Sequence, residues 1–315
     1  MAASLPAFIS ASMSPAAPPQ IFDRDKLKAR RQTFARHFQD YDFLRARVSS
    51  DLETRVADTP RIFEAALELG GANGGLSETL LGQNRTKSVT IADTADAFLD
   101  AARARGLDAV FADPEALPFE AERFDLIVSP LILHWVNDLP GALVQIRRAL
   151  KPDGLFLGAL FGAGTLAELR EVLSEAESEL MGGLSPRLSP LPGLRDMASL
   201  LQRAGFALPV VDRDTVTVRY REPEGLFRDL KGMGERAAFA RGVGRPLPRR
   251  VLARAMALYR ERFSDPDGRV RATFEIVHLS GWAPAPGQPK PLRPGSAKAS
   301  MADAVKRAGQ SGKDS

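Results

Sequence analysis

The chain has 315 residues, of which 44% are hydrophobic and 26% charged, with a formal net charge of +4 and no cysteine. This composition is that of a globular protein with one elaborated domain or two small ones, and it excludes an intrinsically disordered chain. The lack of cysteine excludes disulfides, thiolate metal sites and a cysteine nucleophile. Residues 283–315 carry six basic and two acidic side chains, which leaves residues 1–282 neutral overall. The surplus charge therefore belongs to one end of the chain, and we expect no nucleic-acid partner.

The two ends differ in composition from the rest. Residues 1–20 contain four prolines and no charged side chain, which predicts a disordered leader without the basic residues of a secretory signal or a presequence. Residues 283–315 are poor in large apolar side chains and predict a disordered basic tail. The longest uncharged run between the ends, residues 154–167, has 14 residues, against the roughly 20 that cross a bilayer. We therefore expect a cytoplasmic protein with at most peripheral contact to a membrane.

Strand-like and helix-like segments alternate through residues 61–282. Residues 21–60 precede them and predict a helical segment that covers the following domain. Apolar runs predict strands at 63–69, 89–93, 109–112, 124–129 and 155–161, and strand character returns at 203–218 and 270–279. The pattern predicts an α/β fold, a doubly wound Rossmann-like sheet of seven strands whose last strand is antiparallel, with late helical and loop insertions.

Local signals mark individual elements. Asp138, followed by a proline, predicts the start of a helix. Thr165 and Glu168 form a Thr-x-x-Glu pattern, which predicts a capping box at the next helix. Residues 151–154, Lys-Pro-Asp-Gly, predict a turn before the fifth strand. The Gly- and Pro-rich residues 181–195 predict a lid or a substrate loop.

The first strand runs into a glycine-rich turn that precedes a helix, where backbone N–H groups can approach a ligand closely. Two cofactors compete for this turn. A dinucleotide fingerprint would use Gly70, Ala72 and Gly75. The S-adenosylmethionine pattern would begin at Glu68 and use Gly74 in place of Gly75. Glu68 favours the second cofactor, because its ammonium and sulfonium attract a carboxylate and a pyrophosphate does not.

Two further acids follow strand ends. Asp93 closes the second strand, 25 residues after Glu68, at a position where a carboxylate accepts both hydroxyls of a ribose. Asp113 follows the third strand and is expected to accept a hydrogen bond from an adenine amino group, with Leu117 packed on the ring. Three acids at three consecutive strand ends favour a nucleoside-containing cofactor.

Together these motifs resemble those of class I S-adenosylmethionine-dependent methyltransferases, in the order ELGGANGG (68–75), IAD (91–93), ADPEALPF (112–119) and FDLIVS (124–129). The resemblance implies S-adenosylmethionine as the cofactor. The residues expected to bind it are Glu68, Gly70, Gly71, Ala72, Gly74, Asp93, Thr94, Ala112, Asp113, Leu117 and Ser129. At Ala72 the chain departs from the glycine that the family usually has, and we expect the added methyl to press on the methionine part of the cofactor.

A narrower resemblance, over roughly residues 21–300, is to the respiratory complex I assembly factor 5 (arginine hydroxylase) family. It is carried by segments such as IFDRDKLKARRQ (21–32), LKPDGLFLGALFGAGTLAELR (150–170), DLKGMGE (229–235) and GRVRATFEIVHLSGW (268–282). It implies action on a protein partner, a complex I subunit, at an arginine. A looser resemblance to the malonyl-carrier-protein methyltransferase of biotin synthesis implies O-methylation of a carrier-bound or small-molecule carboxylate. A third hypothesis is a non-catalytic assembly scaffold with a degenerate cofactor site.

Methyl transfer needs an aligned acceptor and a group that removes its proton. The candidate catalytic residues are His134, after the fourth strand, and Tyr41 from the N-terminal segment. No metal site is predicted, since the histidines show no His-x-Asp pair. Residues 23–47 hold eight basic and four acidic side chains, which predicts a solvated helix or a partner-docking face.

Overall fold

The computed structural model describes residues 19–243 and 245–289. It divides the chain into a compact unit that ends at Pro284 and a second unit that begins at Ala285. Of the leader expected at 1–20, only residues 19–20 are described, and of the tail expected at 283–315, only residues 283–289. The rest of both segments lies outside the described residues. Ala283 is buried, and its N–H donates to the Gly154 carbonyl. This hydrogen bond continues the pairing of β7 with β5 beyond Trp282.

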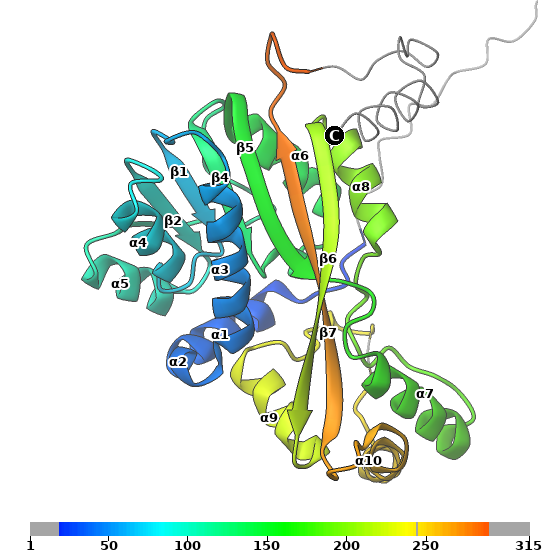
Figure 1. Ribbon diagram of the computed structural model, residues 1–315. Helices are drawn as coiled ribbons and strands as arrows, with labels where there is room; N and C mark the ends of the chain where they lie inside the picture. Colours follow the sequence, from blue (N-terminus) through cyan, green and yellow to red (C-terminus); the bar gives the residue numbers. More distant parts are fainter. Residues whose placement is uncertain (1–18, 244, 290–315) are drawn as a thin grey trace, which may run out of the picture. The chain divides into compact units, whose positions relative to one another are not determined.

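The compact unit is built on one seven-stranded sheet in the order β3-β2-β1-β4-β5-β7-β6 (Figure 1). The strands are β1 Ala66–Leu69, β2 Val89–Asp93, β3 Asp108–Phe111, β4 Phe124–Pro130, β5 Leu150–Phe161, β6 Ala207–Tyr220 and β7 Val270–Trp282. β7 pairs antiparallel with both of its neighbours, and the other pairs are parallel. The predicted sheet, including its antiparallel last strand, is confirmed.

Helices precede, connect and follow these strands. They are α1 Arg24–Ala35, α2 Phe38–Tyr41, α3 Phe43–Ala57, α4 Gly75–Gly82, α5 Asp96–Ala104, α6 Leu139–Ala149, α7 Ala167–Met181, α8 Leu194–Arg203, α9 Pro223–Gly232 and α10 Arg249–Phe263, with a 3₁₀ turn η1 at Leu133–Trp135. Two apolar cores lie on opposite faces of the sheet. One contains side chains of α3 and α4, and the other those of α6 and α8. Alternate residues of β5 enter alternate cores, since successive side chains of a strand point to opposite faces.

Helices α7, α9 and α10 gather around the part of β6 and β7 that extends beyond the other strands (Figure 1). β7 pairs with β5 only through its carboxyl half, at residues 276–282, whereas it pairs with β6 over its whole length. The amino-terminal half of β7 therefore has no strand on its β5 side. Helices α7 and α10 pack against β7 there, and α9 packs against β6. This group of helices stands over the carboxyl edge of the parallel strands, where ligands bind in folds of this class.

Two local predictions fail and one is confirmed. The carboxylate of Asp138 caps α6 by accepting from the Gly141 N–H at 2.9 Å. The capping box expected at α7 is absent: Thr165 exchanges hydrogen bonds with the backbone of Glu275, and Glu168 accepts from Thr273. Strand β7 thus takes up both side chains that the sequence pattern assigns to the helix end. The turn expected at residues 151–154 lies inside β5, at a register shift opposite β4.

Candidate cofactor and substrate site

The glycine-rich turn after β1 has the backbone that its residues suggest. Gly70 and Gly74 have φ values of 73° and 79°, in the left-handed region that favours glycine. A Cβ at Gly70 would lie 2.7 Å from the Cβ of Ile132, so the position also requires glycine for packing. Ala72 is fully buried in an apolar cluster with Phe34 and Phe98. Its methyl packs there, and the expected contact of this methyl with a cofactor stays a prediction.

Asp93 lies at the end of β2, where the ribose acceptor was predicted, and its carboxylate is already in use. It accepts from the N–H groups of Ala72 and Ala95 at 3.2 and 3.0 Å. Arg31 of α1 donates two more hydrogen bonds to the same carboxylate, one of them at 3.0 Å. Burial alone would raise the pKa of Asp93, but the charge and hydrogen bonds of Arg31 outweigh it and hold the pKa below its usual value.

Glu68, at the end of β1, is also buried and also paired with an arginine. Its carboxylate accepts from the Ser77 N–H at 3.1 Å and lies 3.4 Å from Arg45 Nη2. Burial raises the pKa of Glu68, opposed by the charge of Arg45 and the bonds from Ser77. Arg45 donates to the carbonyls of Gly70 and Pro130 at 2.6 and 2.8 Å. It therefore ties α3 to the carboxyl ends of β1 and β4.

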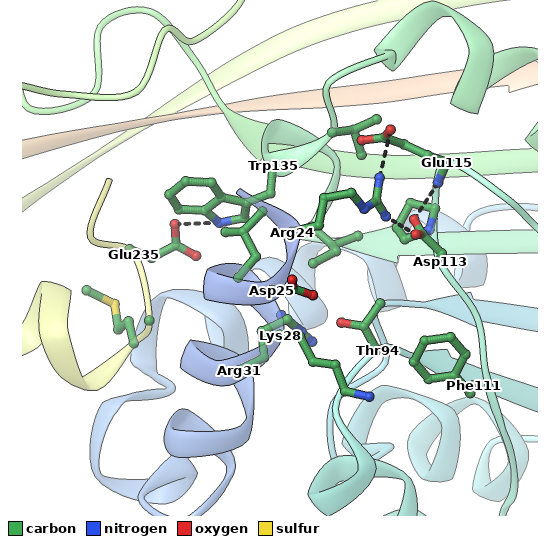
Figure 2. A pocket seen from close by; sticks show the side chains of 16 residues that line it. Arg24, Asp25, Lys28, Arg31, Thr94, Phe111, Asp113, Glu115, Trp135 and Glu235 are labelled. Carbon is green, nitrogen blue, oxygen red and sulfur yellow. Dashed lines mark hydrogen bonds and ion pairs between the residues drawn. The ribbon is translucent and has the colours of Figure 1, made fainter. Parts of the chain in front are cut away.

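Asp113, after β3, completes the row of acids. Arg24 at the start of α1 bridges Asp113 and Glu115, the latter at 2.7 Å (Figure 2). The ammonium of Lys28 lies 5.0 Å from the centre of the Phe111 ring. Arg24, Lys28 and Arg31 are spaced i, i+4, i+7 and so share one face of α1. This face lies along the ends of β2 and β3. The basic residues of 23–47 were predicted to be solvated or to dock a partner. Arg31 and Arg45 are instead largely buried on the acids.

Beside α1 the structure encloses a cavity of about 180 Å³, the cofactor cavity (Figure 2). Of the residues predicted to bind the cofactor, Thr94 and Asp113 line it. Ala112 and Leu117 belong to the adjoining apolar core. Ser129 is buried and donates to the Leu69 carbonyl at 3.2 Å. Two of the eleven predicted residues thus line the cavity, and Arg24, Leu27, Lys28 and Arg31 of α1 line it as well.

A second cavity, of about 710 Å³, lies among α7, α9, the residues after α9 and the loop 186–191. That loop is part of the segment 181–195 predicted as a lid or substrate loop. His134 lines this cavity and is buried. Tyr41 does not line it: it borders a small space of about 20 Å³ under α2. The two predicted catalytic side chains are thus in different places.

Glu235, after α9, connects the two cavities because it lines both. Its Oε2 lies 3.0 Å from His134 Nε2 and accepts from Trp135 Nε1 at 3.1 Å. The sequence reasoning missed Glu235, although it closes the segment DLKGMGE. It also missed Arg24, Arg31 and Arg45 as site residues, for which the only signal was the basic composition of the segment.

In residues 19–243 and 245–289, no group of three or more His, Cys, Asp or Glu side chains is arranged to hold a metal ion. In the same residues, no helix is both long and apolar enough to span a bilayer.

Comparison with known proteins gives the family. Residues 67–158 match the model of a methyltransferase domain. Over 292 residues the chain is 41% identical to the arginine-hydroxylase NDUFAF5, mitochondrial, of Danio rerio, covering 91% of this chain and 90% of the relative. The chain belongs to the NDUFAF5 arginine-hydroxylase family. The human member is 42% identical over 288 residues, covering 90% of this chain and 83% of the relative.

More distant matches agree with this assignment. The malonyl-[acyl-carrier protein] O-methyltransferase of Halorhodospira halophila is 33% identical, covering 84% of this chain and 89% of the relative. Among solved structures, YcgJ of Bacillus subtilis matches with a TM-score of 0.53 at 15% identity, covering 74% of this chain and 97% of that chain. A putative methyltransferase of Bacillus halodurans matches with a TM-score of 0.52 at 18% identity, covering 74% of this chain and 99% of that chain. These structures establish the methyltransferase fold.

The matched domain is an S-adenosylmethionine-binding domain, and its residues can be tested against that cofactor. The hydrogen-bond acceptors fit this cofactor, because carboxylates stand at the ends of β1, β2 and β3. The space fits less well: the cofactor cavity is smaller than the roughly 300 Å³ at which pockets for ligands of this size begin. Arg31 of α1 lines the cavity and donates to the Asp93 carboxylate. A cofactor that used this carboxylate would have to displace Arg31.

Proposed function

We propose that this protein binds S-adenosylmethionine and acts on an arginine side chain of a protein partner in the assembly of respiratory complex I. The observation that carries the proposal is the 41% identity, across nine-tenths of both chains, to a relative named as an arginine-hydroxylase. The complex I partner rests on the resemblance of segments such as residues 21–32 and 150–170. The relatives are mitochondrial by name, and the cytoplasmic location expected from the sequence stays a prediction.

The strand-end acids would hold the cofactor, with Asp93 on the ribose, Asp113 on the adenine and Glu68 toward the methionine ammonium. When bound, S-adenosylmethionine supplies an activated methyl group on a sulfonium. All three acids lie at the edge that the cofactor cavity borders. Occupation of Asp93 would require Arg31 to leave its carboxylate, since two carboxylate oxygens offer about four acceptor positions.

Glu235 is the residue placed to receive the arginine. Its Oε2 is taken by His134 and Trp135, while Oε1 accepts no hydrogen bond from the described residues. A carboxylate binds a guanidinium through charge-assisted bonds and orients it. In a methyl transfer, the bond from the methyl carbon to the sulfonium would break as the guanidinium nitrogen bonds to that carbon. Glu235 would take the proton that the nitrogen loses, and His134 would hold the carboxylate in place.

Intact-mass measurement of the partner subunit co-purified with the protein tests the proposal. A gain of one methylene indicates methyl transfer, and a gain of one oxygen atom indicates hydroxylation. Either mass change, located on an arginine, supports the proposal. Glu235→Gln is expected to remove the change, and the exposed Glu222→Gln to leave it. An unmodified partner from wild-type cells would contradict the proposal.

Two other candidates have specific support. The 33% identity to a malonyl-[acyl-carrier protein] O-methyltransferase favours methylation of a carrier-bound carboxylate, which labelled cofactor and a malonyl-carrier substrate would reveal. The ion pairs on Asp93 and Asp113 favour a scaffold with a degenerate site. Full rescue of a gene deletion by an Asp93→Ala, Asp113→Ala variant would select the scaffold.

A further inference from the structure

The wall of the second cavity is apolar. It is formed by side chains that include Phe161, Leu169, Leu173, Phe227, Leu230 and Phe274. They come from β5, α7, α9 and β7, the elements that meet where β7 has lost its β5 neighbour. An apolar surface of this size gains free energy when a ligand covers it. The occupant therefore presents apolar groups to this wall.

The mouth of the same cavity is cationic. Arg170, Lys231, Arg236 and Arg245 line it and are exposed. No ion pair joins any of the four to an acid within the described part of the chain. Arg187 lines the cavity too, but Glu177 neutralises it through a direct ion pair. The mouth thus carries uncompensated positive charge, which attracts acidic groups.

At the inner end of the cavity the sign reverses. Among the described residues, Glu235 is the only carboxylate that lines it, and Glu235, like Trp135, also lines the cofactor cavity. An apolar anion such as a fatty acid would place its chain against this carboxylate, which loses hydration without gaining a donor. Free arginine would satisfy Glu235 but would leave the leucine and phenylalanine wall uncovered. A peptide segment satisfies all three zones.

We propose that the second cavity binds an acidic and apolar segment of the partner protein around the arginine that reacts. Apolar side chains of the segment cover the wall, acidic ones pair with the four cations at the mouth, and the arginine reaches Glu235. The inference rests on the proposed function and deepens it by naming the substrate's chemistry. In this proposal the four cations at the mouth determine which segment binds. Glu235 accepts the hydrogen bonds of the guanidinium.

Fluorescence anisotropy with short labelled peptides tests the charge of the mouth. One probe has a central arginine flanked by leucine and glutamate, and its matched probe has lysine in place of glutamate. We expect the acidic probe to bind about tenfold more tightly, as a few exposed ion pairs supply, and to lose this advantage in high salt. Equal affinity of the two probes would overturn the proposal.

Charge reversal supplies the matched variants. Arg236→Glu is expected to weaken the acidic probe and to strengthen the lysine probe. Arg228→Glu, at an exposed arginine of α9 that does not line the cavity, is expected to change neither. A variant that misfolds would weaken both probes, so the opposite signs separate misfolding from specificity. Equal effects of the two substitutions, or displacement of the bound acidic probe by oleate, would overturn the proposal.

A third probe, with methionine in place of the central arginine, tests the inner end. Loss of the arginine should cost affinity in the wild type but not in Glu235→Gln, a coupling that a double-mutant cycle measures. These binding data are independent of any chemical step. If the partner is modified at the normal rate by Arg236→Glu, the inference fails and the proposed function stands. If peptide binding depends on charge but the partner shows no mass change, the proposed function fails and the inference about the cavity stands.

Discussion

The carboxylate of Asp93 accepts four hydrogen bonds inside the protein, two from backbone N–H groups and two from Arg31. A carboxylate has about four acceptor positions, so a ribose and Arg31 compete for the same oxygens. The pair is buried, with 13% of the Arg31 side chain and none of the Asp93 side chain exposed. If Asp93 binds the ribose as proposed, Arg31 occupies the position that the ribose would take.

Arg31→Met tests two effects of this ion pair separately: its competition with the cofactor for Asp93 and its contribution to stability. The variant should bind S-adenosylmethionine about tenfold or more tightly, because the ribose no longer displaces charge-assisted bonds, which are worth about 1.5–3 kcal/mol each. It should also lose about 3–5 kcal/mol of unfolding free energy, because Asp93 stays buried without its cation. Calorimetric titration measures the first effect and urea unfolding the second.

Arg24→Met is the control for that experiment. Arg24 and its partner Asp113 are partly exposed, so the loss of unfolding free energy should stay below about 1 kcal/mol. Weaker cofactor binding by Arg31→Met would show that Arg31 holds the cofactor instead of competing with it.

At the scale of elements, the sequence predicts what local pattern determines. Every predicted strand is present: buried parallel strands appear as apolar runs, and the antiparallel β6 and β7 show an alternating pattern. The acids at 68, 93 and 113 follow from those strands, since parallel strands end at one edge. The contact between α1 and this edge cannot be predicted from the sequence. Helical spacing shows that Arg24, Lys28 and Arg31 share a face, but it does not show what that face contacts. Glu235 is equally hidden, as it meets His134 across 101 residues of chain.

Helix starts show the same limit. Asp138 caps α6 as predicted, whereas Thr165 and Glu168 bond to β7 in place of the α7 backbone. A cap is a local interaction unless a neighbouring strand competes for the same side chains. Leu166, at the N-cap of α7, has a φ of 55° and no side-chain cap. The start of α7 is thus held by its tie to β7.

Asp138→Ala tests the one cap that the sequence identified. Loss of the bond to the Gly141 N–H should lower the unfolding free energy by about 0.5–2 kcal/mol, as measured by urea denaturation. Asp100→Ala is the matched control: this aspartate is exposed on α5 and pairs only with Arg103 three residues on. A change of equal size in the two variants would contradict the assigned cap.

Across the whole compact unit, the N-terminal helices join distant parts of the sheet. Arg31 and Arg45 reach the ends of β2 and β1, while Arg55 and Arg47 of this segment pair with Asp212 and Asp214 of β6. β6 is the edge strand farthest from β3. Movement of α1 off the cofactor cavity therefore need not disturb the rest of the segment, because α3 is anchored independently at β6.

His278 in β7 lies near that anchor, and we expect it to make the stability of the compact unit depend on pH. Its side chain is 2% exposed, and its Nε2 is 3.9 Å from Asp51 of α3. Burial lowers the pKa of His278, with Arg55 adding to the effect and Asp212, Asp51 and Asp214 opposing it. Its Nδ1 has no hydrogen-bond partner among the described residues.

The sign of the pH effect follows from where the proton binds. An unfolded histidine has a pKa of about 6.5, and the folded His278 has a lower one. As pH falls below about 6.5, this histidine binds a proton in the unfolded chain but not yet in the folded one. The unfolding free energy therefore declines until the pH reaches the pKa of His278 in the folded protein. The slope is at most about 1.4 kcal/mol per pH unit. His278→Gln should remove this contribution, and the exposed His37→Gln should keep it. Urea unfolding between about pH 5 and pH 8 measures all three proteins, and coincident slopes for the wild type and His278→Gln would contradict the assignment.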